Sequence, residues 1–139
     1  MKELLIDTNV ILDLLAKREP FYDGAAQIFS LADKNKITLS ISSLTFANIN
    51  YVLAKLKTAA EAREILRRFQ TLIKVLSLND KIIDLALNDS KFNDFEDGLQ
   101  YYSAIETTQN IIITRDLKDF KNSKIPVMSP EEYLTSTGY

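Results

Sequence analysis

The sequence contains neither cysteine nor histidine among its 139 residues. Without cysteine there are no disulfides, no thiol nucleophile and no thiolate metal site, and a reducing compartment is permitted. Without histidine there is no imidazole base for Ser-His or Cys-His catalysis and no histidine-rich zinc site. Any polar chemistry must therefore use carboxylates, lysine, tyrosine or hydroxyl groups.

Long hydrophobic runs and a large excess of one charge are also missing. Only three apolar residues follow Met1-Lys2-Glu3, too few for a signal-peptide core or a membrane span, so we expect a cytoplasmic protein without a membrane segment. The net charge of −2 does not in itself indicate a nucleic-acid binder, although clustered carboxylates can conceal a basic surface. With 46% hydrophobic and 26% charged residues, the chain has the composition and length of one globular domain over residues 1–139.

Short apolar segments of β type alternate along the chain with longer helical patterns. This alternation predicts an α/β domain with a mainly parallel sheet. The expected strands cover residues 4–6, 38–42, 75–78, 111–114 and 125–128. The expected helices include one after Asp7 that Pro20 closes, one capped by Ser43, one from Asp94 to about residue 108, and a short one opened by residues 129–132.

Three aspartates occupy the positions at which an open parallel sheet binds its ligands. Asp7 directly follows the first expected strand, Asp116 lies two residues beyond the strand 111–114, and Asp97 lies one turn into the helix before that strand. Carboxylates that are packed together repel one another unless they share a cation. Because Mg²⁺ accepts all-oxygen ligands together with substrate phosphate oxygens, phosphodiester hydrolysis is a natural reaction for such a set.

Each of these acids also has a structural interpretation. Asp7 can cap the first helix, and Asp116 can form a turn over residues 114–117, but for both we favour the functional interpretation. Asp94 and Asp97 can both complement the dipole at the start of their helix. We favour that role for Asp94, whereas for Asp97 the residues alone leave both roles open.

Three segments match the motifs of one known family in the family's order. They are Leu5-Ile6-Asp7-Thr8-Asn9-Val10, then Asp94-Phe95-Glu96-Asp97 at a helix start, then Ile113-Thr114-Arg115-Asp116 with Lys118-Asp119-Phe120. Together they resemble the PIN-domain ribonucleases, and within that family the small bacterial VapC-like toxins. The resemblance spans nearly the whole chain. It implies a three-layer PIN-like domain whose four- to five-stranded, mainly parallel sheet is flanked by helices.

The resemblance implies a Mg²⁺-dependent ribonuclease, with Mn²⁺ as an alternative metal. Asp7, Asp97 and Asp116 would hold one or two ions, and metal-activated water would cleave RNA to leave 5′-phosphate and 3′-hydroxyl ends. As the toxin of a type II toxin-antitoxin pair, the protein would have a small antitoxin as its partner, and a homodimer is implied by the same analogy. The family's polar supporting residues would be Asn9 and Thr114, and we expect Arg115 to contact the RNA backbone because it neighbours Asp116.

One position departs from the family pattern. PIN domains normally carry a glutamate on the helix after the second strand, where this chain has Asn48. An amide oxygen can still bind a metal or orient a water, but it brings no negative charge, so weaker metal affinity is expected. Asp94 or Glu96 can compensate if either points inward. The alternative function is therefore a PIN-fold module that has lost its chemistry and binds RNA or a protein.

A less favoured alternative is a phosphotransferase in which Asp7 accepts a phosphoryl group, as an aspartate after the first strand does in other α/β enzymes. The second aspartate expected two positions later is replaced by Asn9, which argues against this chemistry. Tyr101 and Tyr102 suggest base stacking, but their apolar neighbours predict partly buried helix residues instead.

Overall fold

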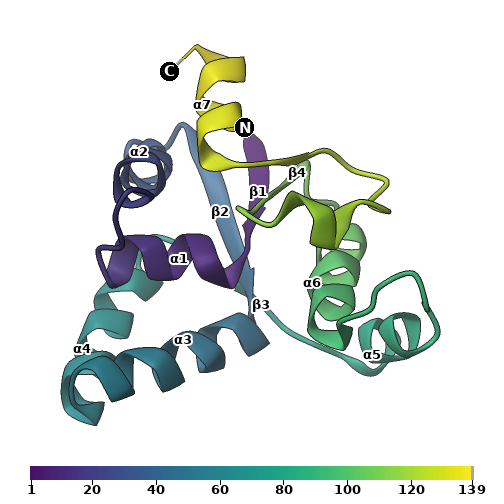
Figure 1. Ribbon diagram of the computed structural model, residues 1–139, viewed down its shortest axis with the longest axis horizontal. Coiled ribbons are helices and arrows are strands. Elements are labelled where there is room, and N and C mark those ends of the chain that lie inside the picture. The colour runs from purple at the N-terminus through teal and green to yellow at the C-terminus, as the bar shows by residue number, and fades with distance from the viewer. Residues whose placement is uncertain (139) are drawn as a thin grey trace.

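Five parallel strands form one sheet in the computed structural model, which describes residues 1–138 (Figure 1). The strand order is β3-β2-β1-β4-β5, and each neighbouring pair is parallel. The strands are β1 (Lys2–Ile6), β2 (Ile37–Ser42), β3 (Lys74–Leu76), β4 (Ile111–Ile113) and β5 (Val127–Met128). This confirms the α/β fold with a mainly parallel sheet, although the last three strands are shorter than expected.

Helices connect the strands, and most begin at side-chain caps that the sequence indicates. The helices are α1 (Thr8–Leu15), α2 (Tyr22–Asp33), α3 (Ser43–Leu56), α4 (Ala59–Gln70), α5 (Asp80–Leu87), α6 (Phe95–Glu106), η1 (Leu117–Phe120) and α7 (Pro130–Thr137). Asp94 and Ser129 cap α6 and α7 as predicted, whereas α3 is capped by Ser42 and not by Ser43. Among the helices described, none has the length and apolar composition of a membrane-spanning segment.

The sheet divides the core into two parts. Leu4 and Ile6 point into the larger core, which α1, α2, α3, α4 and α7 cover, and Leu5 points into a smaller core under α6 and η1. Successive residues of a strand face opposite sides of the sheet, so an uninterrupted apolar segment such as residues 4–6 of β1 is the expected pattern where a strand is covered on both faces. Figure 1 shows α5 and α6 on one side of the sheet and α1 to α4 on the other. The predicted three-layer arrangement is confirmed.

The first helix ends earlier than predicted. It stops at Leu15, five residues before Pro20, because Lys17 adopts the left-handed conformation with φ 51°. The amides of Lys17 and Arg18 then donate to the carbonyls of Leu14 and Asp13 at 3.3 and 3.0 Å. This pattern is a Schellman motif, which satisfies the last carbonyls of a helix, and it usually has glycine where this chain has Lys17.

Candidate active site

The candidate site lies where the order of the sheet changes direction. Strands β1 and β4 are neighbours at that point, with Ile6 paired to Ile113, and the chain continues from them towards opposite edges of the sheet. The amide of Asp7 donates to the carbonyl of Ile113 at 2.9 Å, so Asp7 and Thr114 leave the sheet together. In open α/β sheets this switch point, at the carboxyl ends of the strands, is where ligands bind.

Asp7 is the most buried acid of the site, with 7% of its surface exposed. Its Oδ1 accepts hydrogen bonds from the amide of Thr8 at 2.8 Å and from Gln100 Nε2 at 2.7 Å, and its Oδ2 accepts one from Thr114 Oγ1 at 2.7 Å. Burial raises the pKa of Asp7 more than these donors lower it, and the nearby charge of Asp116 adds to the rise. Asp7 therefore both caps α1 and presents a carboxylate that is poorly solvated.

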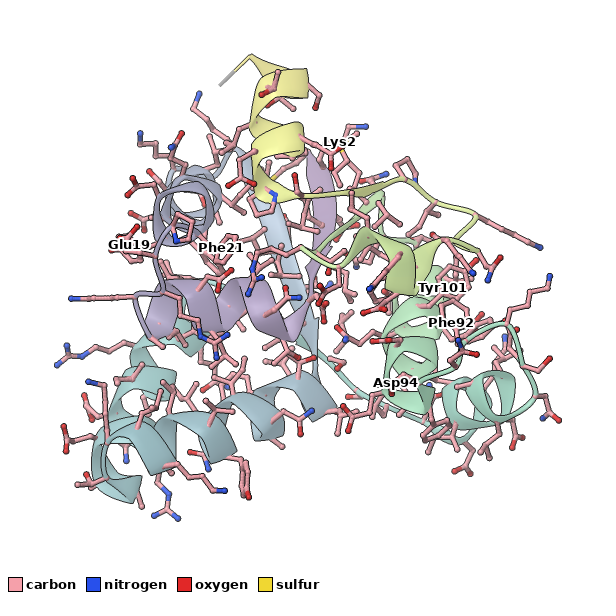
Figure 2. All side chains as sticks on the ribbon, in the orientation of Figure 1. Lys2, Glu19, Phe21, Phe92, Asp94 and Tyr101 are labelled. Atoms are coloured by element: carbon pink, nitrogen blue, oxygen red, sulfur yellow. The ribbon has the colours of Figure 1, made fainter. Side chains whose placement is uncertain are left out.

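Asp97 faces the same space from the first turn of α6. Burial, followed by the repulsion of neighbouring carboxylates, raises its pKa to about 7. The carboxylates that contribute are, in decreasing order, those of Asp94, Asp7, Asp119 and Glu96. Asp94, labelled in Figure 2, accepts a hydrogen bond from the amide of Glu96 at 2.8 Å and so has the capping role that we favoured for it. The carboxylates that raise the pKa of Asp97 therefore come from three segments of the chain.

Asp116 completes the set of three predicted acids and is exposed. Its Oδ2 accepts a hydrogen bond from Asn9 Nδ2 at 2.8 Å, and its amide donates to Thr114 Oγ1 at 3.0 Å. Because Thr114 also donates to Asp7, the two predicted supporting residues connect the first and third acids. The structure therefore brings Asn9 and Thr114 to the site.

Asn48 approaches the site from α3. Its Nδ2 donates to Glu96 Oε2 at 3.4 Å, so the amide that replaces the family glutamate lies beside a carboxylate from α6. The same side of α3 carries Thr45, which is within hydrogen-bonding distance of Thr8 at 3.4 Å. Glu96 thus supplies a negative charge next to the position at which the family pattern expects one.

These side chains line one pocket of about 270 Å³. Its lining residues are Asp7, Thr8, Asn9, Leu12, Arg18, Asn48, Asp94, Glu96, Asp97, Gln100, Asp116 and Asp119. We call it the acidic pocket. All three predicted metal-binding aspartates belong to it, and so does Asn48.

The donor chemistry of the acidic pocket suits a hard divalent cation. Within residues 1–138, no three acidic side chains are already grouped to hold a metal ion. Mg²⁺ does not require such a group, because it uses one or two carboxylates and completes its shell with water and phosphate oxygens. Gln100 Oε1 is buried in the described structure without a hydrogen-bond partner, which leaves a free acceptor beside Asp7. The raised pKa values and this unpaired oxygen are both consistent with a site that needs a cation or its waters.

Sequence reasoning missed Gln100 and Arg18. Gln100 lies three residues after Asp97 and therefore on the same face of α6, a spacing that would have identified it. Among the described residues, Arg18 is the one basic side chain that lines the acidic pocket, and the Schellman motif after α1 places it there. Asp119, which belongs to the third family motif, also lines the pocket.

Arg115 forms contacts that the sequence did not indicate, and its expected contact with RNA stays a prediction. Its Nε and Nη2 donate to Asp13 Oδ2 and Oδ1 at 2.6 and 3.2 Å, and Asp13 is only 1% exposed. The guanidinium also stacks on Phe21, with its central carbon 3.9 Å from the ring centroid. Figure 2 labels Phe21 near the start of α2. Arg115 does not line the acidic pocket, because the buried carboxylate of Asp13 holds its charge elsewhere.

Tyr101 and Tyr102 are helix residues of the smaller core, as predicted. Tyr101 is 4% exposed and packs against Phe92 with ring centroids 5.0 Å apart. Figure 2 labels both residues. The hydroxyl of Tyr102 donates to Asp89 Oδ2 at 2.6 Å, and this bond raises the pKa of Tyr102 to about 12. The packing of both rings in the smaller core favours the structural interpretation of these residues.

The family is shown by a direct sequence match. The family model described as PIN domain matches residues 3–118, and the chain therefore belongs to the PIN-domain family. The sequence has no match among curated proteins.

Several solved structures with a similar fold are VapBC complexes or a VapC toxin. The chain is similar to DNA-bound VapBC from Salmonella typhimurium, with a TM-score of 0.72, 16% identity, and coverage of 94% of this chain and 99% of that one. It is similar to VapBC-1 from nontypeable Haemophilus influenzae, with a TM-score of 0.71, 17% identity, and coverage of 93% and 98%. VapC20 from Mycobacterium tuberculosis, a toxin that cleaves the sarcin-ricin loop, has a TM-score of 0.62 at 13% identity, with coverage of 78% and 86%. At these identities the likeness shows the fold.

Proposed function

We propose that this protein is a metal-dependent ribonuclease that cleaves RNA phosphodiester bonds at the acidic pocket. The observation that carries the proposal is the convergence of Asp7, Asp97 and Asp116 on one pocket at the switch point of the sheet. Membership of the PIN-domain family and the VapC-like fold support the same chemistry. We further propose that it acts in the cytoplasm as the toxin of a toxin-antitoxin pair, because similar folds occur in VapBC complexes.

In this proposal the three aspartates hold Mg²⁺, with Mn²⁺ as the alternative. When bound, the metal supplies stabilisation of phosphate charge and a water of lowered pKa. Gln100 and Thr114 fix the orientation of the Asp7 carboxylate through their hydrogen bonds. Arg18 contacts a phosphate oxygen of the RNA, because it lines the pocket as a cation among acids. The expected products have 5′-phosphate and 3′-hydroxyl ends.

A second candidate function is a PIN-fold module that binds RNA or protein without cleaving it. The substitution of Asn48 for the family glutamate favours it, because the pocket has one charged ligand fewer on α3. The hydrogen bond from Asn48 to Glu96 argues for the nuclease instead, since it keeps a carboxylate beside that position. A phosphotransferase remains the least favoured alternative, and acyl-phosphate formation on Asp7 with a phosphoryl donor would support it.

The test of the nuclease is a cleavage assay on structured RNAs with Mg²⁺, comparing the native protein with Asp7→Asn. We expect the substitution to reduce the rate at least about 100-fold, because it removes the most buried carboxylate of the pocket while keeping its shape. EDTA should abolish cleavage by the native protein. The matched control is Asp84→Asn, which neutralises an exposed aspartate on α5 and should leave the rate unchanged.

Cleavage that survives both EDTA and Asp7→Asn would remove the metal site from the proposal. A native protein that binds RNA in this assay and never cleaves it would favour the binding module.

A further inference from the structure

A second pocket adjoins the acidic pocket and has basic side chains. It has a volume of about 270 Å³ and shares Asp94, Asp97 and Asp119 with the acidic pocket. Its other lining residues are Lys91, Asn93, Lys118, Lys121 and Asn122. We call this the lysine pocket.

The lysine pocket is built from two segments that the fold joins. Lys91 and Asn93 precede α6, and the remaining residues belong to η1 and the turn after it. Asn122 Nδ2 donates a hydrogen bond to the carbonyl of Lys91 at 3.2 Å, and this bond connects the two segments. The lysines are therefore presented on a common support, next to the carboxylates that would hold the metal.

The three lysines are exposed, and none forms an ion pair within 4.0 Å in the described structure. Other basic residues are engaged in such pairs, as Arg67 is with Glu64 and Arg115 is with Asp13. Lysines that are not held in an ion pair within 4.0 Å remain available to phosphate oxygens, which they contact as point charges. The overall net charge of −2 does not reveal this local group of three lysines.

We propose that the lysine pocket is a subsite for the phosphate backbone of the RNA strand on one side of the bond that is cut. The inference rests on the proposed function, since it supposes that RNA lies across the acidic pocket. Arg18, which follows α1 on the other face of the sheet from η1 and α6, contacts the strand on the opposite side. A strand that crosses the carboxylates is thus held by cations on both sides, and the contacts are independent of base sequence.

The test measures RNA binding separately from cleavage. The probe is a fluorescein-labelled, 12-nucleotide single-stranded RNA, and the proteins all carry Asp7→Asn so that the probe stays intact with Mg²⁺. We expect the combined variant Lys91→Gln, Lys118→Gln and Lys121→Gln to bind at least about tenfold more weakly by fluorescence anisotropy. The slope of log affinity against log salt should fall by about 0.7 for each phosphate contact that is lost.

The matched control is Lys34→Gln, which removes an exposed lysine beyond the C-terminal end of α2 and should change neither the affinity nor the slope. In the protein with an intact Asp7, the lysine variants should raise KM and leave kcat nearly unchanged, because they bind substrate without touching the reacting atoms. Circular dichroism should be unaltered, since the three side chains are exposed.

The outcomes separate this inference from the proposed function. If the parent protein binds the probe and the combined variant binds equally well, or if Lys34→Gln weakens binding as much, the lysine pocket is not the subsite. If the parent binds no RNA, the subsite is equally overturned. If RNA is bound through the lysines and the protein with an intact Asp7 never cleaves it, the subsite stands and the nuclease fails.

Discussion

At the scale of one residue, the raised pKa of Asp97 shows that the acidic pocket disfavours negative charge in the absence of a cation. Its pKa of about 7, compared with 3.8 for an unperturbed aspartate, means that the folded protein binds this proton more tightly than the unfolded chain does. The stability contributed by the proton is fully present below pH 3.8 and is lost as the pH rises to 7. Without metal, an ionised Asp97 therefore destabilises the fold.

We predict that Asp97→Asn is more stable than the native protein at pH 8 in EDTA, and that this difference shrinks at pH 5. Urea unfolding at the two pH values measures it, since the amide keeps the shape and cannot ionise. Added Mg²⁺ should stabilise the native protein at pH 8 and have a much smaller effect on the variant. An equal difference between the two proteins at both pH values would contradict the raised pKa.

A second prediction at the residue scale concerns Arg115, because hydrogen bonds from this residue connect its loop to α1. The buried Asp13 holds the guanidinium, and Asn9, one turn earlier on α1, accepts weakly from the Arg115 amide at 3.5 Å and donates to Asp116. Arg115→Lys keeps the charge and loses the bidentate hydrogen bonding to Asp13. We expect about tenfold weaker Mn²⁺ binding by calorimetry, because Asp116 is positioned less well.

The control for Arg115→Lys is Lys81→Met, which removes an ion pair of 2.7 Å with Glu106 outside the acidic pocket. It should leave Mn²⁺ binding unchanged. Native affinity in Arg115→Lys would show that the pair with Asp13 serves stability alone.

At the scale of secondary-structure elements, the order of strands and helices was predictable because local signals agree with the tertiary fold. The apolar segments at β1 and β4 fit buried strands, and the caps Asp94 and Ser129 begin α6 and α7. Asp7 and Thr114 could be assigned to the site because the carboxyl end of a parallel strand is a defined location. The end of α1 was not predictable from Pro20, since Lys17 adopts an unusual conformation for a residue other than glycine.

Side-chain direction was harder to predict than the position of an element. Arg115 follows β4 beside Asp116, but it points to Asp13, whose burial follows from the packing of α1 and not from a local pattern. The lysine pocket joins two segments that are distant in sequence, so no spacing could reveal it. The sequence therefore identified the acids of the site better than its cations.

The contact between α3 and α6 gives a prediction for a pair of elements. Asn48→Glu would place a second carboxylate within reach of Glu96, so the variant should be less stable without metal and bind Mn²⁺ more tightly. Glu96→Gln should weaken Mn²⁺ binding in the native protein and weaken it less in the Asn48→Glu background. Calorimetry on the four proteins of this double-mutant cycle measures the coupling. Additive effects would show that Glu96 does not compensate for Asn48.

At the scale of the whole molecule, the two faces of the sheet supply different parts of the site. One face contributes Asn9 from α1, Arg18 from the turn after α1 and Asn48 from α3, and the other contributes Asp97 and Gln100 from α6. The switch point brings these parts together beyond the ends of β1 and β4 (Figure 1). The rigid sheet can therefore hold mutually repelling acids at a fixed place, which the proposed nuclease requires.

The central claim is that carboxylates from separate elements share one divalent cation. An anomalous difference map from a crystal of the protein grown with Mn²⁺ tests it most directly. We predict a peak within the acidic pocket, coordinated by oxygens of Asp7, Asp97 or Asp116, and no such peak in a crystal of Asp7→Asn. A fully ordered acidic pocket without a peak at saturating Mn²⁺, or a peak only at another place on the molecule, would contradict the account.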